Sequence, residues 1–170
     1  MSDFLYKMDY AVRASIPVAG CFALILFTFA PWPPLVKELF QALPLILLCF
    51  WVMHRPDLFS LAWSFILGVL FDALAGHVIG LTAIGFVLAD MLLRNQRGFL
   101  KHHAFIASWL VASGVIALAH MVPWLMVGVF SGFVFTDFPP VALRIGFSIL
   151  LFPAVAGLLY RWQPVPQEST

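Results

Sequence analysis

Residues 58–93 read LFSLAWSFILGVLFDALAGHVIGLTAIGFVLADMLL, and this stretch decides the fold. It holds two apolar segments, 58–75 and 77–93, which little more than Gly76 separates. A helix that crosses a membrane needs about 20 mostly apolar residues. Each segment approaches that length, so we predict two spans joined by a tight turn. If the pair were a broken hairpin that failed to cross, the chain would have four spans instead of six.

Four further apolar segments flank this pair: 14–29, 39–53, 104–130 and 141–160. The first ends at Pro31, Pro33 and Pro34, because proline cannot continue the helical hydrogen-bond ladder. It is expected to be an uncleaved span, since no small-x-small cleavage site precedes these prolines. Lys37 and Glu38 are expected in the loop that follows. The prediction is an all-α, polytopic six-helix transmembrane bundle that forms one domain over residues 1–162, with a flexible cytoplasmic tail over 163–170.

The composition agrees with a protein whose solvent is lipid. Of the 170 residues, 63% are hydrophobic and 10% are charged, against about 25% charged in average soluble domains. A net charge of +1 leaves no basic footprint for nucleic acid. Disorder, a disulfide scaffold and a nucleic-acid binder are thereby excluded.

Basic residues predict the orientation, because they stay on the cytoplasmic side of a membrane. If the N-terminus is cytoplasmic, six spans place two of the nine basic residues, Lys37 and Arg144, on the opposite side. We therefore predict a multi-pass protein of the bacterial inner membrane with both termini in the cytoplasm. The basic residues expected on the cytoplasmic side are Lys7, Arg13, Arg55, Arg94, Arg97, Lys101 and Arg161.

Four ionisable residues fall inside the predicted spans, where a charge costs at least about 2.5 kcal/mol: Asp72, Asp90, His120 and Arg144. Asp72 and Arg144 share a depth near the outer ends of their spans. They either pair, face a polar cavity or reach the headgroup layer, and Asp137 is a rival partner for Arg144.

Asp90 precedes Arg94 by four residues, a spacing that predicts an ion pair on one helix face. His120 is expected to be a neutral imidazole that forms a hydrogen bond between helices.

No residue pattern predicts catalysis, a cofactor or a metal. Cys21 and Cys49 lie in apolar segments without ligand spacing, and buried cysteine usually behaves as a small apolar residue. His102 and His103 are adjacent, which is insufficient for a metal site without further ligands. They are expected in a basic loop beside anionic lipid.

Glycines spaced four residues apart allow helices to approach closely in lipid. Gly76 and Gly80 have this spacing, as do Gly128 and Gly132. On this interpretation Gly80→Leu blocks a close helix contact. Asp72→Ala is expected to weaken function by destabilising the outer half of the bundle.

Several residues between 42 and 85 resemble the MreD family of rod shape-determining proteins. Leu43-Pro44 is followed by the turn Arg55-Pro56-Asp57, then by Gly68-Val69-Leu70-Phe71-Asp72, Gly76 and Ile79-Gly80-Leu81. The family pattern is G-L-x-x-D-x-x-x-G-x-x-x-G after an R-P-D-like turn, and Val69 replaces its usual leucine. The resemblance covers about a quarter of the chain, and its candidate structural or interface residues are Asp72, Gly76, Gly80, Arg144, Arg55 and Asp57.

The resemblance implies a non-enzymatic scaffold of the cell-elongation machinery. Its partner would be a bitopic MreC-type protein, which links it indirectly to MreB filaments and to a RodA-type polymerase with its transpeptidase. A groove of small and aromatic side chains would accept the partner's single span, with Asp72 and Gly76 near it.

The resemblance also implies the six-helix fold of substrate-binding subunits of energy-coupling-factor vitamin transporters. Such a subunit is the alternative function, with a cavity lined by Trp32, Trp124, Phe133, Phe135, Asp72 and Arg144.

Overall fold

Helices make up all the regular secondary structure that the computed structural model describes, which covers residues 18–57, 59–76, 78–96, 105–133, 135 and 137–162. An apolar helix over Val18–Thr28 comes first. Five longer helices follow it in chain order: α2 (Pro34–His54), α3 (Leu61–Ala75), α4 (Leu81–Asn95), α6 (Phe105–Phe130) and α7 (Phe138–Trp162). The predicted all-α membrane fold is confirmed.

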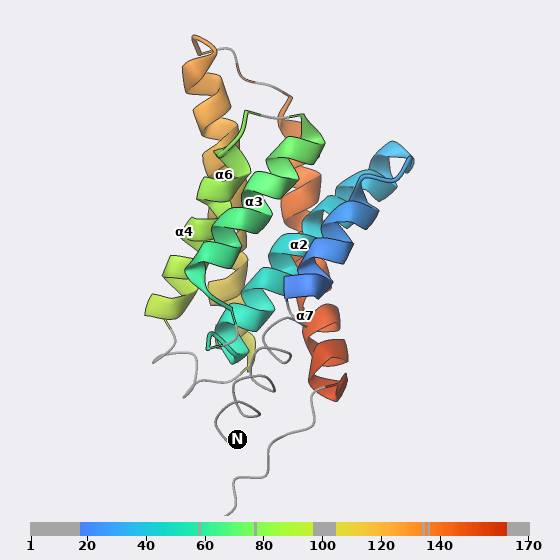
Figure 1. Cartoon of the computed structure of the whole chain (residues 1–170), viewed down its shortest axis with the longest axis vertical. Coiled ribbons are helices and arrows are strands. Elements are labelled where there is room, and N and C mark those ends of the chain that lie inside the picture. The colour runs from blue at the N-terminus through green and yellow to red at the C-terminus, as the bar shows by residue number, and fades with distance from the viewer. Residues whose placement is uncertain are drawn as a thin grey trace, which may run out of the picture.

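Three of the described helices are long and apolar enough to cross a membrane: α2, Ile106–Phe130 of α6 and Phe138–Leu159 of α7. α3 and α4 have 15 residues each, fewer than the roughly 20 that a perpendicular span requires. Figure 1 shows the pair as neighbouring helices that run the same course in opposite directions. The third and fourth predicted segments therefore form a short antiparallel hairpin.

The helix boundaries follow local rules that the hydrophobic segments alone do not contain. α2 begins at Pro34, five residues before the predicted segment, because proline suits the first helical turn, where no N–H is needed. Lys37 and Glu38 are therefore helical, and their assignment to a loop was wrong. α7 likewise begins before its segment, at Phe138, with two prolines in its first turn. α3 begins after Ser60, whose side chain accepts a hydrogen bond from the N–H of Ala62 at 3.2 Å.

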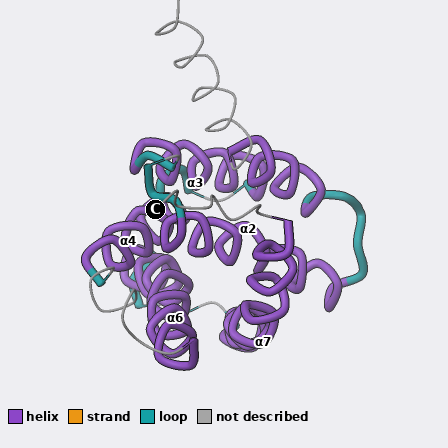
Figure 2. The backbone as a smooth tube through the Cα atoms, turned by 90° about the horizontal axis from the view of Figure 1, so that it is seen from below, coloured by secondary structure: helices purple, strands orange, loops and turns teal. Residues whose placement is uncertain are grey.

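Four helices surround the middle of the bundle. α2 packs against α4 and α7, and α6 packs against both α4 and α7. Viewed end on, α2, α4, α6 and α7 form a ring, and α3 lies outside it against α4 (Figure 2). The core includes Ile46, Phe50, Leu67, Phe86 and Ile116, all at most 4% exposed.

The two ends of the bundle differ in their residues. We call the end that holds Gly76 and Asp137 the outer end, and the end that holds Arg55 and Arg94 the inner end. Figure 1 shows the α3–α4 turn and the α6–α7 connection together at the top, which is the outer end. Arg161, in the last turn of α7, lies at the inner end. The tail over 163–170, residues 14–17, Lys7, Arg13, Arg97, Lys101, His102 and His103 lie outside the described residues.

Candidate functional site

Asp72 is a fully buried carboxylate that caps the N-terminus of α4. Its Oδ2 accepts hydrogen bonds from the backbone N–H groups of Gly80 at 2.9 Å and Thr82 at 3.0 Å, and a longer one from Ala83 at 3.4 Å. The first N–H groups of a helix have no partner within it, and they carry the positive end of the helix dipole. The carboxylate of α3 therefore satisfies donors of α4, and those donors compensate the buried charge.

Gly76 and Gly80 are turn residues, and neither lies in a close contact between the helices that the structure describes. Gly76 ends α3 with φ +67°, and Gly80 precedes α4 with φ +101°. A Cβ at either position would meet no atom of the described residues within 4 Å. The interpretation of this pair as a helix-approach motif was wrong: glycine is required here for the backbone conformation that aims the N–H groups at Asp72.

Two other glycines allow helices to approach closely. A Cβ at Gly68 would overlap the backbone of Ala83, where α3 meets α4. A Cβ at Gly85 would overlap the carbonyl of Ala119, where α4 meets α6. Close packing of small residues is a main source of helix association in lipid, so these two contacts join α3, α4 and α6.

Gly128 and Gly132 also differ from the predicted helix-approach motif. A Cβ at Gly128 would overlap the ring of Phe135, and Gly132 has φ +74° in the turn after α6. Both glycines shape the connection between α6 and α7.

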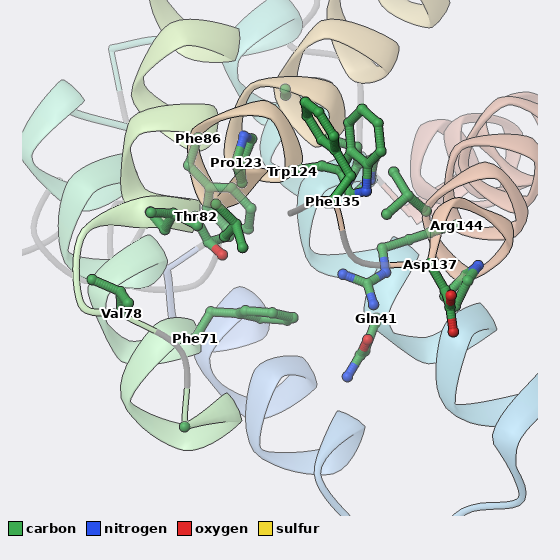
Figure 3. A pocket seen from close by; sticks show the side chains of 17 residues that line it. Gln41, Phe71, Val78, Thr82, Phe86, Pro123, Trp124, Phe135, Asp137 and Arg144 are labelled. Carbon is green, nitrogen blue, oxygen red and sulfur yellow. The ribbon is translucent and has the colours of Figure 1, made fainter. Parts of the chain in front are cut away.

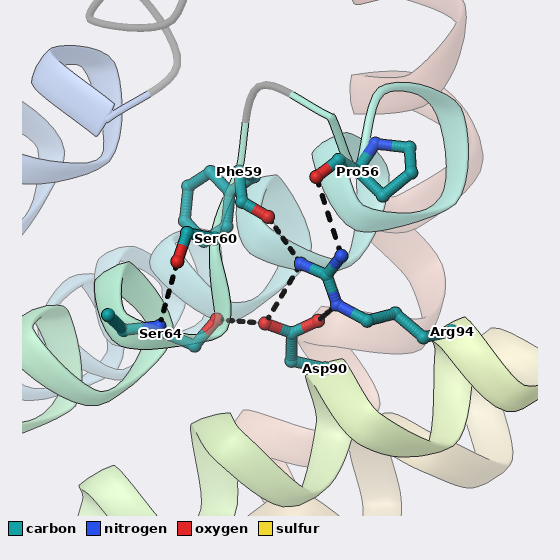
Figure 4. Close-up of polar contacts among 7 residues, drawn as sticks. Pro56, Phe59, Ser60, Ser64, Asp90 and Arg94 are labelled. Carbon is teal, nitrogen blue, oxygen red and sulfur yellow. Dashed lines mark hydrogen bonds and ion pairs between the residues drawn. The ribbon is translucent and has the colours of Figure 1, made fainter.

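Asp90 is the second fully buried carboxylate, and it lies near the inner end (Figure 4). Ser64 of α3 donates a hydrogen bond to its Oδ2 at 2.5 Å, and Arg94 pairs with it one turn along α4. The predicted Asp90–Arg94 ion pair is confirmed. The same guanidinium donates to the carbonyl of Phe59 and, at 3.4 Å, to that of Pro56. Arg94 thereby connects α4 to the turn between α2 and α3.

Arg55 and Asp57 belong to that same turn. Arg55 ends α2, and its N–H donates to the carbonyl of Trp51 at 2.7 Å. The residue before a proline is disfavoured in the helical region, which explains why α2 stops before Pro56. The Arg-Pro-Asp turn therefore presents the Pro56 carbonyl that Arg94 binds.

A cavity of about 770 Å³ occupies the outer half of the bundle. It lies among α2, the α3–α4 turn, α6 and α7, and Figure 3 shows its lining. The aromatic residues of the lining are Phe71, Phe86, Trp124 and Phe135, and its polar residues are Gln41, Thr82, His120, Asp137 and Arg144. Trp32, Phe133 and Asp72, which the alternative function placed in such a cavity, are not among the lining residues.

Arg144 pairs with Glu38 of α2. Its Nε and Nη2 lie 2.9 Å and 2.8 Å from Oε2 of Glu38. An Asp72–Arg144 pair does not form, because the Asp72 carboxylate is held by the N-terminus of α4. Asp137, the rival partner, lines the cavity beside Arg144 without an ion pair among the described residues.

His120 connects α6 and α7 at the cavity wall. Its Nε2 lies 3.4 Å from Oγ of Ser148, which donates to the carbonyl of Arg144 at 2.8 Å. The contact lies between helices, as predicted for this imidazole.

Gln41 lines the cavity and Glu38 pairs with the lining residue Arg144, but the sequence singled out neither of them as a site residue. They lie three residues apart on α2, on one helix face. Glu38 was missed because it was assigned to a loop, and Gln41 because it stands as a single amide within the predicted segment 39–53. Gln41 is 5% exposed, and within the part of the chain that the structure describes its Oε1 has no hydrogen-bond partner. A buried acceptor without a partner costs about 1–3 kcal/mol.

The described residues contain no group of three His, Cys, Asp or Glu side chains that could hold a metal ion. Cys21 and Cys49 are buried free thiols in the core.

Comparison with known proteins identifies relatives of one kind. The sequence profile described as rod shape-determining protein MreD matches residues 11–162. Over 55 residues the chain is 36% identical to the rod shape-determining protein MreD of Haemophilus influenzae. That alignment covers 32% of this chain and 34% of the relative, so the chain matches about a third of the relative's length. No solved structure matches the chain.

Proposed function

Because the chain belongs to the MreD family of rod shape-determining proteins, we propose that it is a non-enzymatic inner-membrane scaffold of the cell-elongation complex. The match over residues 11–162 is the observation that carries the proposal, and it supports a role in determining cell shape. It favours this role over the vitamin-transporter subunit that the sequence left open. Both termini are placed in the cytoplasm, a proposal that rests on the distribution of basic residues.

The proposed partner is a bitopic MreC-type protein whose single span packs against this bundle. Through that partner the chain would act on MreB filaments and on a RodA-type polymerase with its transpeptidase. Helices in lipid associate by close packing and a few polar contacts, because lipid supplies no hydrophobic drive between them. The partner therefore requires an apolar helix face that the bundle leaves uncovered.

The exposed face of α3 is the surface that we assign to the partner. We define it by Leu61, Phe65, Ile66 and Ala73, which repeat at helical spacing and are all exposed. Among the labelled helices, α3 packs chiefly against α4. Its 15 residues leave it short of a full span, so a longer partner helix beside it would shield its ends from lipid. Asp72 and Gly76 support this face from the outer end, where they fix the α3–α4 turn.

α6 offers a matched control surface. Leu110, Leu118, Leu125 and Val129 are exposed along one stripe of α6, which faces lipid in this assignment.

Site-specific photocrosslinking in native membranes tests the proposal. A photoreactive residue at Phe65 or Ile66 is expected to form a crosslink to a single-span protein with a large periplasmic domain, whereas one at Leu118 or Leu125 is not. Loss of the chain should turn rods into round cells, and the wild-type gene should restore them. Recovery of a pair of ATPases with a transmembrane coupling subunit, in place of cell-wall synthases, would overturn the scaffold function in favour of a transporter module.

A further inference from the structure

The cavity at the outer end has a polar side and an apolar side. In Figure 3, the polar side chains of Gln41, Asp137 and Arg144 lie together on one side, whereas the opposite side is mostly apolar, with Phe71, Val78 and Phe86 beside Thr82. Its volume of about 770 Å³ is within the roughly 300–1,000 Å³ of small-molecule sites. A ligand that fits it combines a polar group with an apolar body.

The polar side offers both acceptors and a donor. Oε1 of Gln41 is a buried acceptor without a partner among the described residues, and Asp137 adds a carboxylate. Arg144 uses Nε and Nη2 on Glu38, which leaves Nη1 as a donor without a partner in the described part of the chain. The charges of Arg144 and Glu38 offset each other, so the site does not favour a purely anionic ligand.

These groups fit a zwitterion that carries N–H donors. A primary ammonium donates three hydrogen bonds, enough for Gln41 and Asp137 together. An anionic oxygen a few atoms away would accept a charge-assisted hydrogen bond from Arg144. A trimethylammonium group has no N–H, and would leave Gln41 unsatisfied.

The rim of the cavity indicates that the ligand comes from the membrane. Val78 and Phe135 line the cavity and are 71% and 46% exposed. Their neighbours Ile79 and Phe133 are also exposed. Arg144 and Glu38 lie within the first two turns of α7 and α2, a depth suited to a headgroup.

We propose that this cavity binds an aminophospholipid, with its phosphate at Arg144, its ammonium at Gln41 and Asp137, and its upper acyl chain against Phe71, Phe86 and Trp124. Binding places a bilayer lipid between α2, α4, α6 and α7, as part of the bundle. The inference rests on the cavity, and it is independent of the shape-determining role.

Native mass spectrometry of the full chain, released from nanodiscs of defined lipid composition, tests the proposal. Phosphatidylethanolamine is expected to be retained at least about fivefold over phosphatidylcholine. The two lipids have the same charges, but phosphatidylcholine has no N–H and therefore cannot form the buried hydrogen bond. Retention over phosphatidylglycerol, which lacks the cation, is expected as well. Equal retention of the first two lipids, or stronger retention of phosphatidylglycerol, would overturn the proposal.

Variants locate the lipid. Gln41→Leu is expected to abolish the preference for phosphatidylethanolamine, whereas Ser113→Ala, which removes a hydroxyl of α6 outside the cavity lining, is expected to keep it. If Gln41→Leu does not fold, the comparison of lipids on the unaltered chain still decides. Free phosphoethanolamine that binds as tightly as the lipid would identify a soluble zwitterion as ligand and overturn the assignment to the membrane.

Discussion

Asp72 and Asp90 are both buried without exposed surface, yet the bundle compensates their charges in different ways. Asp72, at the outer end, receives its hydrogen bonds from backbone N–H groups of α4. Asp90, at the inner end, receives them from the side chains of Ser64 and Arg94. An unpaired buried charge is costly in either position. The comparison teaches that hydrogen bonds stabilise the α3–α4 hairpin at both of its ends. At the outer end the donors are backbone N–H groups, which a side-chain substitution does not remove. At the inner end the donors are side chains, which a substitution does remove.

The largest effect is expected from Arg94→Met. Within the described part of the chain, this change leaves the buried carboxylate of Asp90 with Ser64 as its remaining donor, and it removes the contacts to the carbonyls of Phe59 and Pro56. Loss of one partner of a buried pair costs about 3 kcal/mol or more. We expect the free energy of unfolding, measured by detergent titration with sodium dodecyl sulfate, to fall by that amount.

The double variant Arg94→Met/Asp90→Leu controls this prediction. Because it removes both charges together, it should recover much of the lost stability. A double variant as unstable as Arg94→Met would mean that the carbonyl contacts, and not the ion pair, fasten the inner end.

Asp72→Ala is expected to cost less, about 2 kcal/mol. It leaves uncharged backbone donors at the N-terminus of α4 unsatisfied, which is the loss of a helix cap. Asp72→Asn keeps one acceptor oxygen and should retain about half of that stability in the same titration. If Asp72→Ala melts like the unaltered chain and recovers its partner normally, the cap does not support the outer half of the bundle.

The two carboxylates also show what could be predicted from sequence. The partner of Asp90 on α4 was predictable, because a separation of four residues places two side chains on one helix face. The partners of Asp72 were not, because they are backbone groups whose direction depends on the positive φ angles of Gly76 and Gly80.

The hydrophobic segments predicted the helices but not the cavity. Glu38 pairs with Arg144 of the cavity wall from the second turn of α2, a helix that begins at Pro34, whereas this proline was interpreted as the end of one span and not as the start of the next. The side-chain set of the cavity comes from four separated parts of the chain, and no local pattern connects them.

Substitutions of Gly80 test whether glycine is needed at the outer end for its backbone conformation or for a close helix contact. Its φ of +101° disfavours any side chain, while a Cβ there would meet no described atom within 4 Å. Gly80→Ala and Gly80→Leu should therefore cost the same, about 1 kcal/mol. Unfolding titrations of both variants check this equality. A much greater loss for leucine than for alanine would restore the close helix approach that the glycine spacing suggested.

The smallest effects separate the two kinds of donor most directly. Ser64→Ala removes a side-chain donor from Asp90, and hydrogen bonds between helices in membranes contribute about 0.6 kcal/mol on average. Thr82→Ala removes a side chain of the same kind at the other carboxylate, yet the N–H of residue 82 still donates to Asp72. We expect a small, reproducible loss of stability for Ser64→Ala and none for Thr82→Ala. Equal losses would mean that the Thr82 hydroxyl also stabilises the outer end, and that the two ends are less different than their hydrogen bonds indicate.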